Sequence, residues 1–324
     1  MTRPICLLAV LGLLGCSDEG NDTPEEESQY RQQMRDLVQA IGAYARTVKP
    51  GFVVIPQNGH DLLTIGGEPG GELATSYLGA IDGVGREDLL YGFDSDDQAT
   101  PQQQRDRMLA FMDLAEQNGV EALVTNYCST PANVDSSYAE CAKRGYISFA
   151  ADHRALDDVP AYPKQPYGEN ASNVKSLAGA KNFLYLLDTG AFANPAALVA
   201  AVSATNHDVV ITDLFCEKDQ LSAQDVASMR VKANHGERLL VAYMSIGEAE
   251  KYRYYWKAEW NTTAPAWLDK ENPDWPGNYK VRYWDPAWQQ ILFGDDNSYL
   301  MRIIRAGFDG VYLDIIDAFE YFEG

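Results

Sequence analysis

Eight short segments of this sequence share one pattern, and that pattern limits the fold more than any other feature. Each segment is apolar and rich in β-forming residues, and polar or charged residues follow it. The segments are residues 52–55, 80–84, 122–125, 146–150, 183–187, 209–212, 239–244 and 311–314. Amphipathic segments of helical period lie between several of them, at residues 33–48, 101–117, 194–203, 222–233 and 298–306. This alternation predicts an α/β protein with a (β/α)8 TIM barrel. An open doubly wound sheet is the alternative, but no Gly-rich phosphate-binding turn follows any of the segments.

The last segment opens onto two carboxylates, Asp314 and Asp317, after an apolar run. Burying a charge is unfavourable unless a partner or a function compensates for it. The catalytic groups of (β/α) barrels lie at the C-terminal ends of the strands, so these two acids mark a candidate active site.

The first residues have the layout of a bacterial lipoprotein leader. Residues 1–15 read as a signal peptide, with Arg3 before an apolar core, and residues 13–16 (LLGC) match a lipobox. Cleavage would leave Cys16 as the lipidated N-terminus on a flexible tether, residues 16–28, followed by one domain, residues 29–324. We therefore expect a monomer anchored in the bacterial cell envelope on the extracytoplasmic side. An ordinary secreted protein with a chance cysteine is the alternative.

The cysteines and the net charge limit which disulfides, metals and substrates this chain is expected to have. Cys128 and Cys141 lie in one loop-like stretch, and an oxidising compartment predicts a disulfide between them. No Cys/His group has zinc spacing, and we expect no metal or other cofactor. The net charge of −21 argues against nucleic acid and suits a cationic substrate such as an amino-sugar polymer. A surface that is acidic merely for solubility is the alternative.

From Lys181 onward the sequence resembles TIM-barrel hydrolases of glycoside hydrolase family 114, the endo-α-1,4-polygalactosaminidases. The matching runs are 183–185 (FLY), 211–215 (ITDLF), 242–250 (AYMSIGEAE), 272–275 (NPDW), 283–286 (YWDP) and 310–317 (GVYLDIID). In that family they belong to the first half of the barrel. Residues 31–157 resemble the second half, through 54–59 (VIPQNG) and 81–87 (IDGVGRE). One departure is Asn126, near a position that is usually acidic in these hydrolases.

The resemblance thus covers nearly the whole mature chain with its halves exchanged, which implies a circular permutation. Residues 29–158 would supply the second half of the barrel, 159–180 a linker across the old termini, and 181–324 the first half. Permutation is tolerated where chain ends lie close together. It would place the C-terminus and the start of the first helix, near Ser28, at the same catalytic mouth. An artefact of gene assembly is the alternative.

The resemblance also implies roles for two carboxyls. Asp314 matches the family's nucleophile-like Asp and Glu87 its acid/base Glu, which is the pair that glycoside hydrolysis with retention requires. Glu87 could instead be a surface acid, since Arg86 and Asp88 flank it. Further residues at strand ends are expected to bind substrate: Gln57, Asn58, Tyr127, Asp213, Tyr243, Glu248, Glu250, Arg253 and Asp317. Of these, Asp213 could instead cap a helix, Arg253 could orient Glu248 or Glu250 by a bidentate ion pair, and Asp317 could raise the pKa of Asp314.

All 6 tryptophans lie between Tyr252 and Trp288, in a long segment rich in aromatic residues. Sugar rings stack on such side chains, so the segment is a candidate wall of a glycan cleft. Packing of a long loop onto the barrel explains the same residues without a ligand. Two functions therefore remain: a lipid-anchored glycoside hydrolase acting on a polysaccharide, and a non-catalytic glycan-binding lipoprotein on the same barrel.

Overall fold

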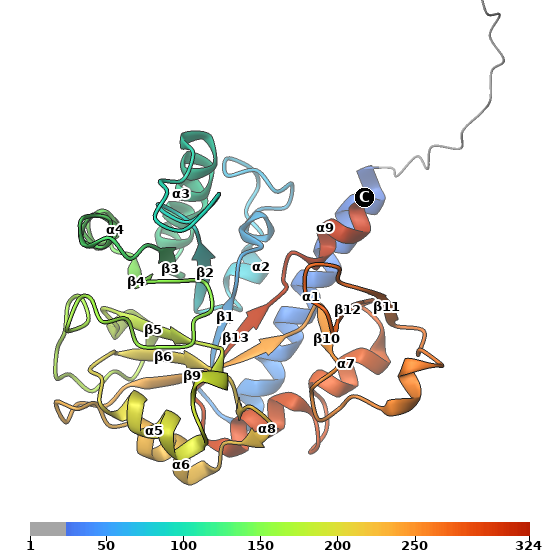
Figure 1. Cartoon of the computed structure of the whole chain (residues 1–324). Helices are drawn as coiled ribbons and strands as arrows, with labels where there is room; N and C mark the ends of the chain where they lie inside the picture. Colours follow the sequence, from blue (N-terminus) through green and yellow to red (C-terminus); the bar gives the residue numbers. More distant parts are fainter. Residues whose placement is uncertain (1–23) are drawn as a thin grey trace, which may run out of the picture.

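The computed structural model describes residues 24–324, with the side chains of residues 24–28 excepted (Figure 1). The signal peptide, Cys16 and most of the tether predicted from the sequence lie outside the described residues. No helix within residues 24–324 is both long and apolar enough to cross a bilayer.

Two parallel sheets form the centre of the molecule. The larger has the strand order β1 (Val53–Pro56), β13 (Gly310–Asp314), β9 (Leu239–Ser245), β6 (Val209–Thr212), β5 (Phe183–Leu186). The smaller has the order β2 (Gly83–Glu87), β3 (Glu121–Tyr127), β4 (Ile147–Ala151). All pairings within both sheets are parallel, so the C-terminal ends of the strands within each sheet point the same way. The structure confirms the α/β class, and each of the eight predicted segments contains or overlaps one of these strands.

Single parallel bridges join the edges of the two sheets. Gln57, just after β1, pairs with Gly85 in β2, and Ser148 in β4 pairs with Asn182 just before β5. β5 therefore lies beside β4 as well as β6.

One long helix precedes these strands, and helices follow most of them. They are α1 (Pro24–Val48), α2 (Thr75–Leu78), α3 (Gln102–Gln117), α4 (Pro131–Arg144), α5 (Pro195–Ser203), α6 (Ala223–Met229), α7 (Pro286–Leu292), α8 (Tyr299–Ala306) and α9 (Ala318–Glu323). Local sequence explains several of their starts. Asn194 caps α5, whose first residue is Pro195, and Ser222 forms a capping box with Asp225 at the start of α6.

Two smaller antiparallel sheets lie among the segments that follow β6 and β9. The strands β10 (Glu248–Glu250), β12 (Asn278–Val281) and β11 (Leu268–Glu271) form one, and β7 (Phe215–Cys216) pairs with β8 (Asp219–Gln220) in the other. The helical turn η4 (Ala258–Asn261) lies between β10 and β11.

The core between the two sheets depends on a close approach at Gly85. A Cβ atom at Gly85 would lie 2.0 Å from the hydroxyl oxygen of Tyr312, which is fully buried. The Tyr312 ring in turn meets the Tyr185 ring at 5.2 Å between centroids. Glycine in β2 is therefore required by the tyrosine of β13.

The predicted disulfide between Cys128 and Cys141 is wrong, because both are buried free thiols in the structure. The stretch predicted to be a loop is the helix α4, which begins at Pro131. Cys128 packs in a small cluster with Tyr138 and Ala150, whereas Cys141 belongs to the main core. Burial raises the pKa of each thiol to about 12, which keeps both protonated.

The connection between β4 and β5 is fixed to the body by a buried ion pair. Lys232 Nζ lies 2.9 Å from Asp208 Oδ1, and both side chains are fully buried. The same ammonium donates to the carbonyl oxygen of Asn170 at 2.8 Å, and Asn170 Nδ2 donates to Asp208 Oδ2 at 2.8 Å. The linker predicted at residues 159–180 is thus attached beside the start of β6.

The C-terminal helix lies against the first helix. Arg31 on α1 donates to both carboxylate oxygens of Glu323 on α9, at 2.8 and 3.0 Å. Tyr30 and Phe322 pack with ring centroids 5.7 Å apart. Figure 1 shows α9 crossing the beginning of α1. The last residues of α9 and the first turns of α1 are therefore neighbours.

Candidate active site

The two predicted catalytic carboxyls come from strands separated by β1. Asp314 ends β13 and Glu87 ends β2. β1 pairs with β13 through Pro56 and Leu313, and its next residue, Gln57, bridges to Gly85. The bridges place the ends of these three strands side by side, so Asp314 and Glu87 lie at the same end of the parallel strands.

Asp314 is partly buried at the end of β13 and has an unusually high affinity for a proton. Burial and the negative charge of Glu87 together raise the pKa of Asp314, whose net value is about 7. The Tyr243 hydroxyl, from the neighbouring strand β9, opposes this by donating to Asp314 Oδ2 at 2.8 Å. Asp317 contributes a smaller upward effect, as the sequence predicted. Asp314 can therefore gain or lose a proton close to neutral pH.

Glu87 is held by neutral donors. The Tyr127 hydroxyl donates to Glu87 Oε1, and Asn58 Nδ2 donates to Oε2 at 3.4 Å. Burial and the Glu87 charge hold the pKa of Tyr127 well above its usual value, so this hydroxyl remains a donor. Asn58 adopts a left-handed backbone conformation, with φ of 58°, and its Oδ1 accepts from the Glu87 backbone N–H at 3.4 Å. Glu87 is not turned outward as a free surface acid.

Arg154 supports the Glu87 side of the site, and sequence analysis missed it. Its guanidinium lies 4.3 Å from the Tyr127 ring centroid and donates to Asp88 Oδ1 at 2.9 Å. It also donates to the Gly92 carbonyl oxygen. Arg154 therefore ties the segment after β2 to the ring that contacts Glu87. Nothing in the local sequence distinguishes it from an ordinary surface arginine.

The acids that follow β6 and β9 are in a different state, because each has a cationic partner. Arg253 makes a bidentate ion pair with Asp213, at 2.8 and 2.7 Å to its two oxygens, whereas the sequence predicted Glu248 or Glu250 as its partner. Its Nε also donates to Glu250 Oε2 at 2.6 Å. Asp213 caps no helix here; its Oδ1 accepts from the Phe215 backbone N–H at 2.8 Å. The two carboxylates raise the pKa of Arg253 well above its usual value and keep it charged.

Glu248 has its own cation. Lys280 Nζ on β12 lies 2.7 Å from Glu248 Oε1, and Asn272 Nδ2 donates to the same oxygen at 2.8 Å. Burial raises the pKa of Asp317, and the nearby Lys280 charge opposes that rise. Lys280 and Asn272 were not predicted as site residues, although Asn272 begins the matched run NPDW.

Gln57 is buried at the end of β1, and its backbone N–H donates to Leu313 at 2.7 Å. Its Oε1 is buried without a hydrogen-bond partner among the described residues, as is the Tyr312 hydroxyl. Both residues belong to the strands that carry or separate the two acids. Polar groups thus continue beneath the carboxyls into the core.

Within residues 24–324, one group of side chains has the spacing to hold a metal ion. Ligand atoms of Asp152, His153 and Asp158, which follow β4, lie within 4.8 Å of one another. Both ring nitrogens of His153 already face carboxylates, at 2.7 Å for Asp152 and 2.5 Å for Asp157. The hydrogen bond to Asp157 raises the pKa of His153. Ion pairing of His153 with Asp152 and Asp157 therefore explains this group without a metal ion.

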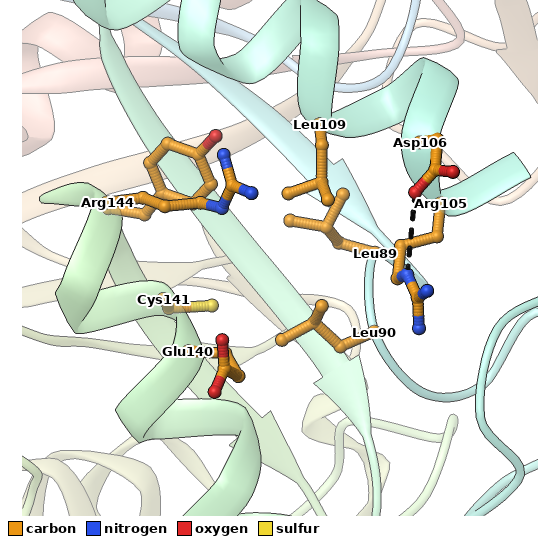
Figure 2. A pocket seen from close by; sticks show the side chains of 9 residues that line it. Leu89, Leu90, Arg105, Asp106, Leu109, Glu140, Cys141 and Arg144 are labelled. Atoms are coloured by element: carbon orange, nitrogen blue, oxygen red, sulfur yellow. Dashed lines mark ion pairs between the residues drawn. The ribbon is translucent and has the colours of Figure 1, made fainter. Parts of the chain in front are cut away.

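A cavity of about 300 Å³ lies elsewhere, between α3 and α4 (Figure 2). Leu89, Leu90 and Leu109 form its apolar side, and Arg105 and Arg144 lie at its edges. Neither Asp314 nor Glu87 lines it. The candidate active site is therefore defined by its carboxyls and their hydrogen bonds rather than by this cavity.

Three curated proteins are similar in sequence to this chain, and each of them is described as an uncharacterized protein. One from Deinococcus radiodurans is 47% identical over 120 residues, which is 37% of this chain and 36% of that protein. One from Methanocaldococcus jannaschii is 37% identical over 180 residues, 54% of this chain and 49% of that protein. One from Thermotoga maritima is 39% identical over 140 residues, 43% of this chain and 40% of that protein. The matches thus span half or less of the length of these relatives.

Residues 166–324 match the family model of glycoside-hydrolase family GH114. The match includes β5, β6, β9 and β13, and with them Asp314, Asp213 and Arg253. It supports a GH114-related glycoside hydrolase, and GH114 is a TIM-barrel family. Glu87 lies outside the matched residues.

Proposed function

We propose that this chain is a glycoside hydrolase that cleaves a polysaccharide with Asp314 and Glu87. The observation that carries the proposal is the contrast in pairing: these two carboxyls are electrostatically coupled and hydrogen-bonded by tyrosines, while the acids beside them are neutralised by Arg253 and Lys280. Two carboxyls without cationic partners at one end of parallel strands are what glycoside hydrolysis uses. The match to family GH114 supports the same reaction class.

The fold proposed for this activity is a closed (β/α)8 barrel with exchanged halves. The bridges Gln57–Gly85 and Ser148–Asn182 join both pairs of sheet edges and support closure. The contact between Arg31 and Glu323 supports the exchange, because it places the C-terminus beside the helix that would otherwise follow β13. The position of the matched residues, 166–324, is consistent with a family half-barrel placed second in the chain.

The mechanism proposed is a retaining one. Asp314 attacks the anomeric carbon while Glu87 gives its proton to the leaving oxygen, and Glu87 then takes a proton from the water that releases the sugar. Tyr243 and Tyr127 orient the two carboxyls through their hydrogen bonds. The pair needs one proton in total, and that proton must pass from Asp314 to Glu87 before the glycosidic bond breaks. Fully ionised, the pair has no acid, and fully protonated, it has no nucleophile.

The substrate proposed first is an amino-sugar polymer such as α-1,4-linked polygalactosamine. Asp314, Glu87 and Asp317 give the site an excess of acids, which attracts a cationic sugar. The lipobox at Cys16 supports a further proposal, that the enzyme is a lipid-anchored monomer in the bacterial cell envelope, outside the cytoplasm.

The experiment is a degradation screen with soluble polygalactosamine, partially deacetylated chitosan and polygalacturonate. We expect reducing ends to appear from one of the amino-sugar polymers, and NMR of the first products should show the anomeric configuration of the substrate. Release of the opposite anomer would replace retention by inversion. Absence of cleavage by wild type, with binding retained, would favour the glycan-binding lipoprotein instead.

A further inference from the structure

Two aromatic side chains are more exposed than any other large apolar side chain in the described part of the chain. Tyr252 and Trp275 are each 68% exposed. Tyr252 follows β10 and Trp275 precedes β12, its antiparallel partner: Glu250 in β10 pairs with Asn278 in β12, and the Lys251 backbone N–H donates to the Gly277 carbonyl oxygen at 2.8 Å. Both residues therefore lie beside the same end of the β10–β12 pair.

The other tryptophans show what ordinary packing looks like in this segment. Trp267 contacts Trp260 and Trp288, with ring centroids 5.0 Å apart in each case. Trp284 packs on Phe322 at 4.7 Å. Trp288 is fully buried and its Nε1 donates to Ile246 at 2.9 Å. Packing thus accounts for most of the aromatic segment, and it leaves Trp275 unexplained.

Trp275 is presented by an ordered turn. Its backbone N–H donates to Asn272 at 3.3 Å, and its carbonyl accepts from Asn278 at 3.0 Å. The Asn272 side chain is in turn bound to the buried Glu248. An exposed indole on a fixed backbone loses little conformational entropy when a ligand stacks on it.

Tyr252 is connected to the candidate active site by successive contacts. Its hydroxyl donates to Glu250 Oε1 at 2.5 Å, and Glu250 is bound by Arg253. The Arg253 guanidinium lies 6.0 Å from the Tyr243 ring centroid, and Tyr243 binds Asp314. The Tyr252 ring therefore has a defined position relative to Asp314, one side chain beyond the Asp213–Arg253–Glu250 network.

We infer that Tyr252 and Trp275 form a sugar-stacking surface that holds a glycan chain away from the bond being cleaved, so that a polymer is preferred to a short glycoside. Flat aromatic faces bind the apolar faces of pyranose rings, and the Tyr252 hydroxyl and Trp275 indole N–H add polar edges that suit sugar hydroxyls. The inference about cleavage rests on the proposed function, whereas binding of the chain does not.

The test is native affinity electrophoresis in gels that contain polygalactosamine, chitosan or polygalacturonate. The protein carries Asp314→Asn throughout, so that bound polymer is not degraded. We expect one gel to retard it, and Trp275→Ala or Tyr252→Ala to weaken the apparent affinity about tenfold, the equivalent of about 1.4 kcal/mol. Trp275→Phe and Tyr252→Phe keep an aromatic face and should retain most of the binding.

The matched control is Tyr162→Ala. Tyr162 is 40% exposed, lies in the connection between β4 and β5, and bonds Asp135 at 2.8 Å. We expect its mobility in each gel to equal that of the unmodified protein. Thermal unfolding of every variant checks that binding losses do not come from unfolding.

Activity separates this inference from the proposed hydrolase. With Asp314 restored, Trp275→Ala should raise KM on the polymer with kcat nearly unchanged, and should not change the rate on an aryl glycoside of the same sugar. Unaltered retardation of both alanine variants, or no retardation in any gel, overturns the sugar-stacking surface. Retardation that Trp275→Ala abolishes, without cleavage by wild type, supports the surface and overturns the hydrolase.

Discussion

Two groups of acids follow the strands of this molecule, and they differ in what surrounds them. At the ends of β6 and β9, Asp213 and Glu250 share Arg253, and Glu248 has Lys280. At the ends of β13 and β2, Asp314 and Glu87 are held by Tyr243 and Tyr127. A tyrosine orients a carboxyl without supplying a compensating charge. The first group is therefore fixed in its ionised form, whereas the second can gain and lose a proton.

The presence or absence of a cationic partner also decides how each group of acids affects the stability of the fold. In a buried ion pair with good geometry, the attraction between the charges offsets the cost of removing them from water. Removing one partner leaves the other charge buried and uncompensated, which destabilises the fold. A carboxyl pair without a cation is destabilising as it stands, which is a common property of active sites. Substitutions at the two groups should consequently have opposite effects on stability.

The largest expected effect is on catalysis. Asp314→Asn and Glu87→Gln should each lower kcat by about 10²–10⁴-fold, since each keeps the size of the side chain and removes its acid–base or nucleophilic chemistry. The measurement is reducing-end release from the polymer that wild type degrades fastest.

Asp188→Asn is the control for that measurement. Asp188 also follows a strand, β5, but its carboxylate accepts from the Gly190 backbone N–H at 2.9 Å. We expect near wild-type kcat for it. Full activity of Glu87→Gln would remove Glu87 from the mechanism.

The next effect is on stability at the paired acids. Arg253→Met leaves Asp213 and Glu250 buried without their cation, which should lower the free energy of unfolding by about 3–5 kcal/mol. Denaturant unfolding at pH 8 measures it. Arg305→Met is the matched control: it breaks an exposed pair with Asp296, so a loss of less than about 1 kcal/mol is expected. Equal losses for the two variants would contradict the contrast.

Asp314→Asn should change the free energy of unfolding in the opposite direction, towards greater stability. The folded pKa of Asp314 is about 7, above the unfolded value of about 3.9, so the folded state binds more protons between these values. Its ionisation therefore destabilises the fold progressively as pH rises from about 4 to 7, and fully above 7. Removing it should raise the free energy of unfolding by about 2–4 kcal/mol at pH 8 and change little below pH 4.

Asp213→Asn is the companion measurement, because it should destabilise at pH 8, where Asp314→Asn stabilises. A loss of stability in both variants at that pH would show that the two groups of acids are not distinct.

The strands could be predicted from sequence because each is a short apolar run between polar residues. Boundaries were less accurate: residues 80–84 were predicted where β2 is Gly83–Glu87, so Glu87 lies on the strand rather than beyond it. Helix α4 was missed because its sequence is rich in small and polar residues. Its buried positions Val134, Tyr138 and Cys141 nevertheless have helical spacing, and that spacing was the available signal.

Much less of the site followed from the residues alone. An ion pair between Arg253 and Glu250 could be predicted because the two residues are three positions apart on the chain. The bidentate pair of Arg253 with Asp213, 40 positions away, could not. The pairing of Glu248 with Lys280 was not, since it depends on β12 lying beside β10. Likewise, Asp314 and Glu87 come from opposite halves of the chain, and only the order β13–β1 and the bridge to β2 bring them together.

The smallest expected effect concerns the pH dependence of the carboxyl pair. The pair loses its last proton near the pKa of Asp314, about 7, so kcat/KM should fall as pH rises through that value. The hydrogen bond from Tyr243 lowers this pKa, so Tyr243→Phe should move the falling limb to higher pH. A hydrogen bond to a charged group contributes about 1.5–3 kcal/mol, which sets an upper limit on the displacement. Tyr254→Phe is the control, because the Tyr254 hydroxyl donates to Asn297 at 3.3 Å rather than to either acid. If the fall of kcat/KM with rising pH stays at the same pH in Tyr243→Phe, or moves to lower pH, a group other than the Asp314–Glu87 pair supplies the proton.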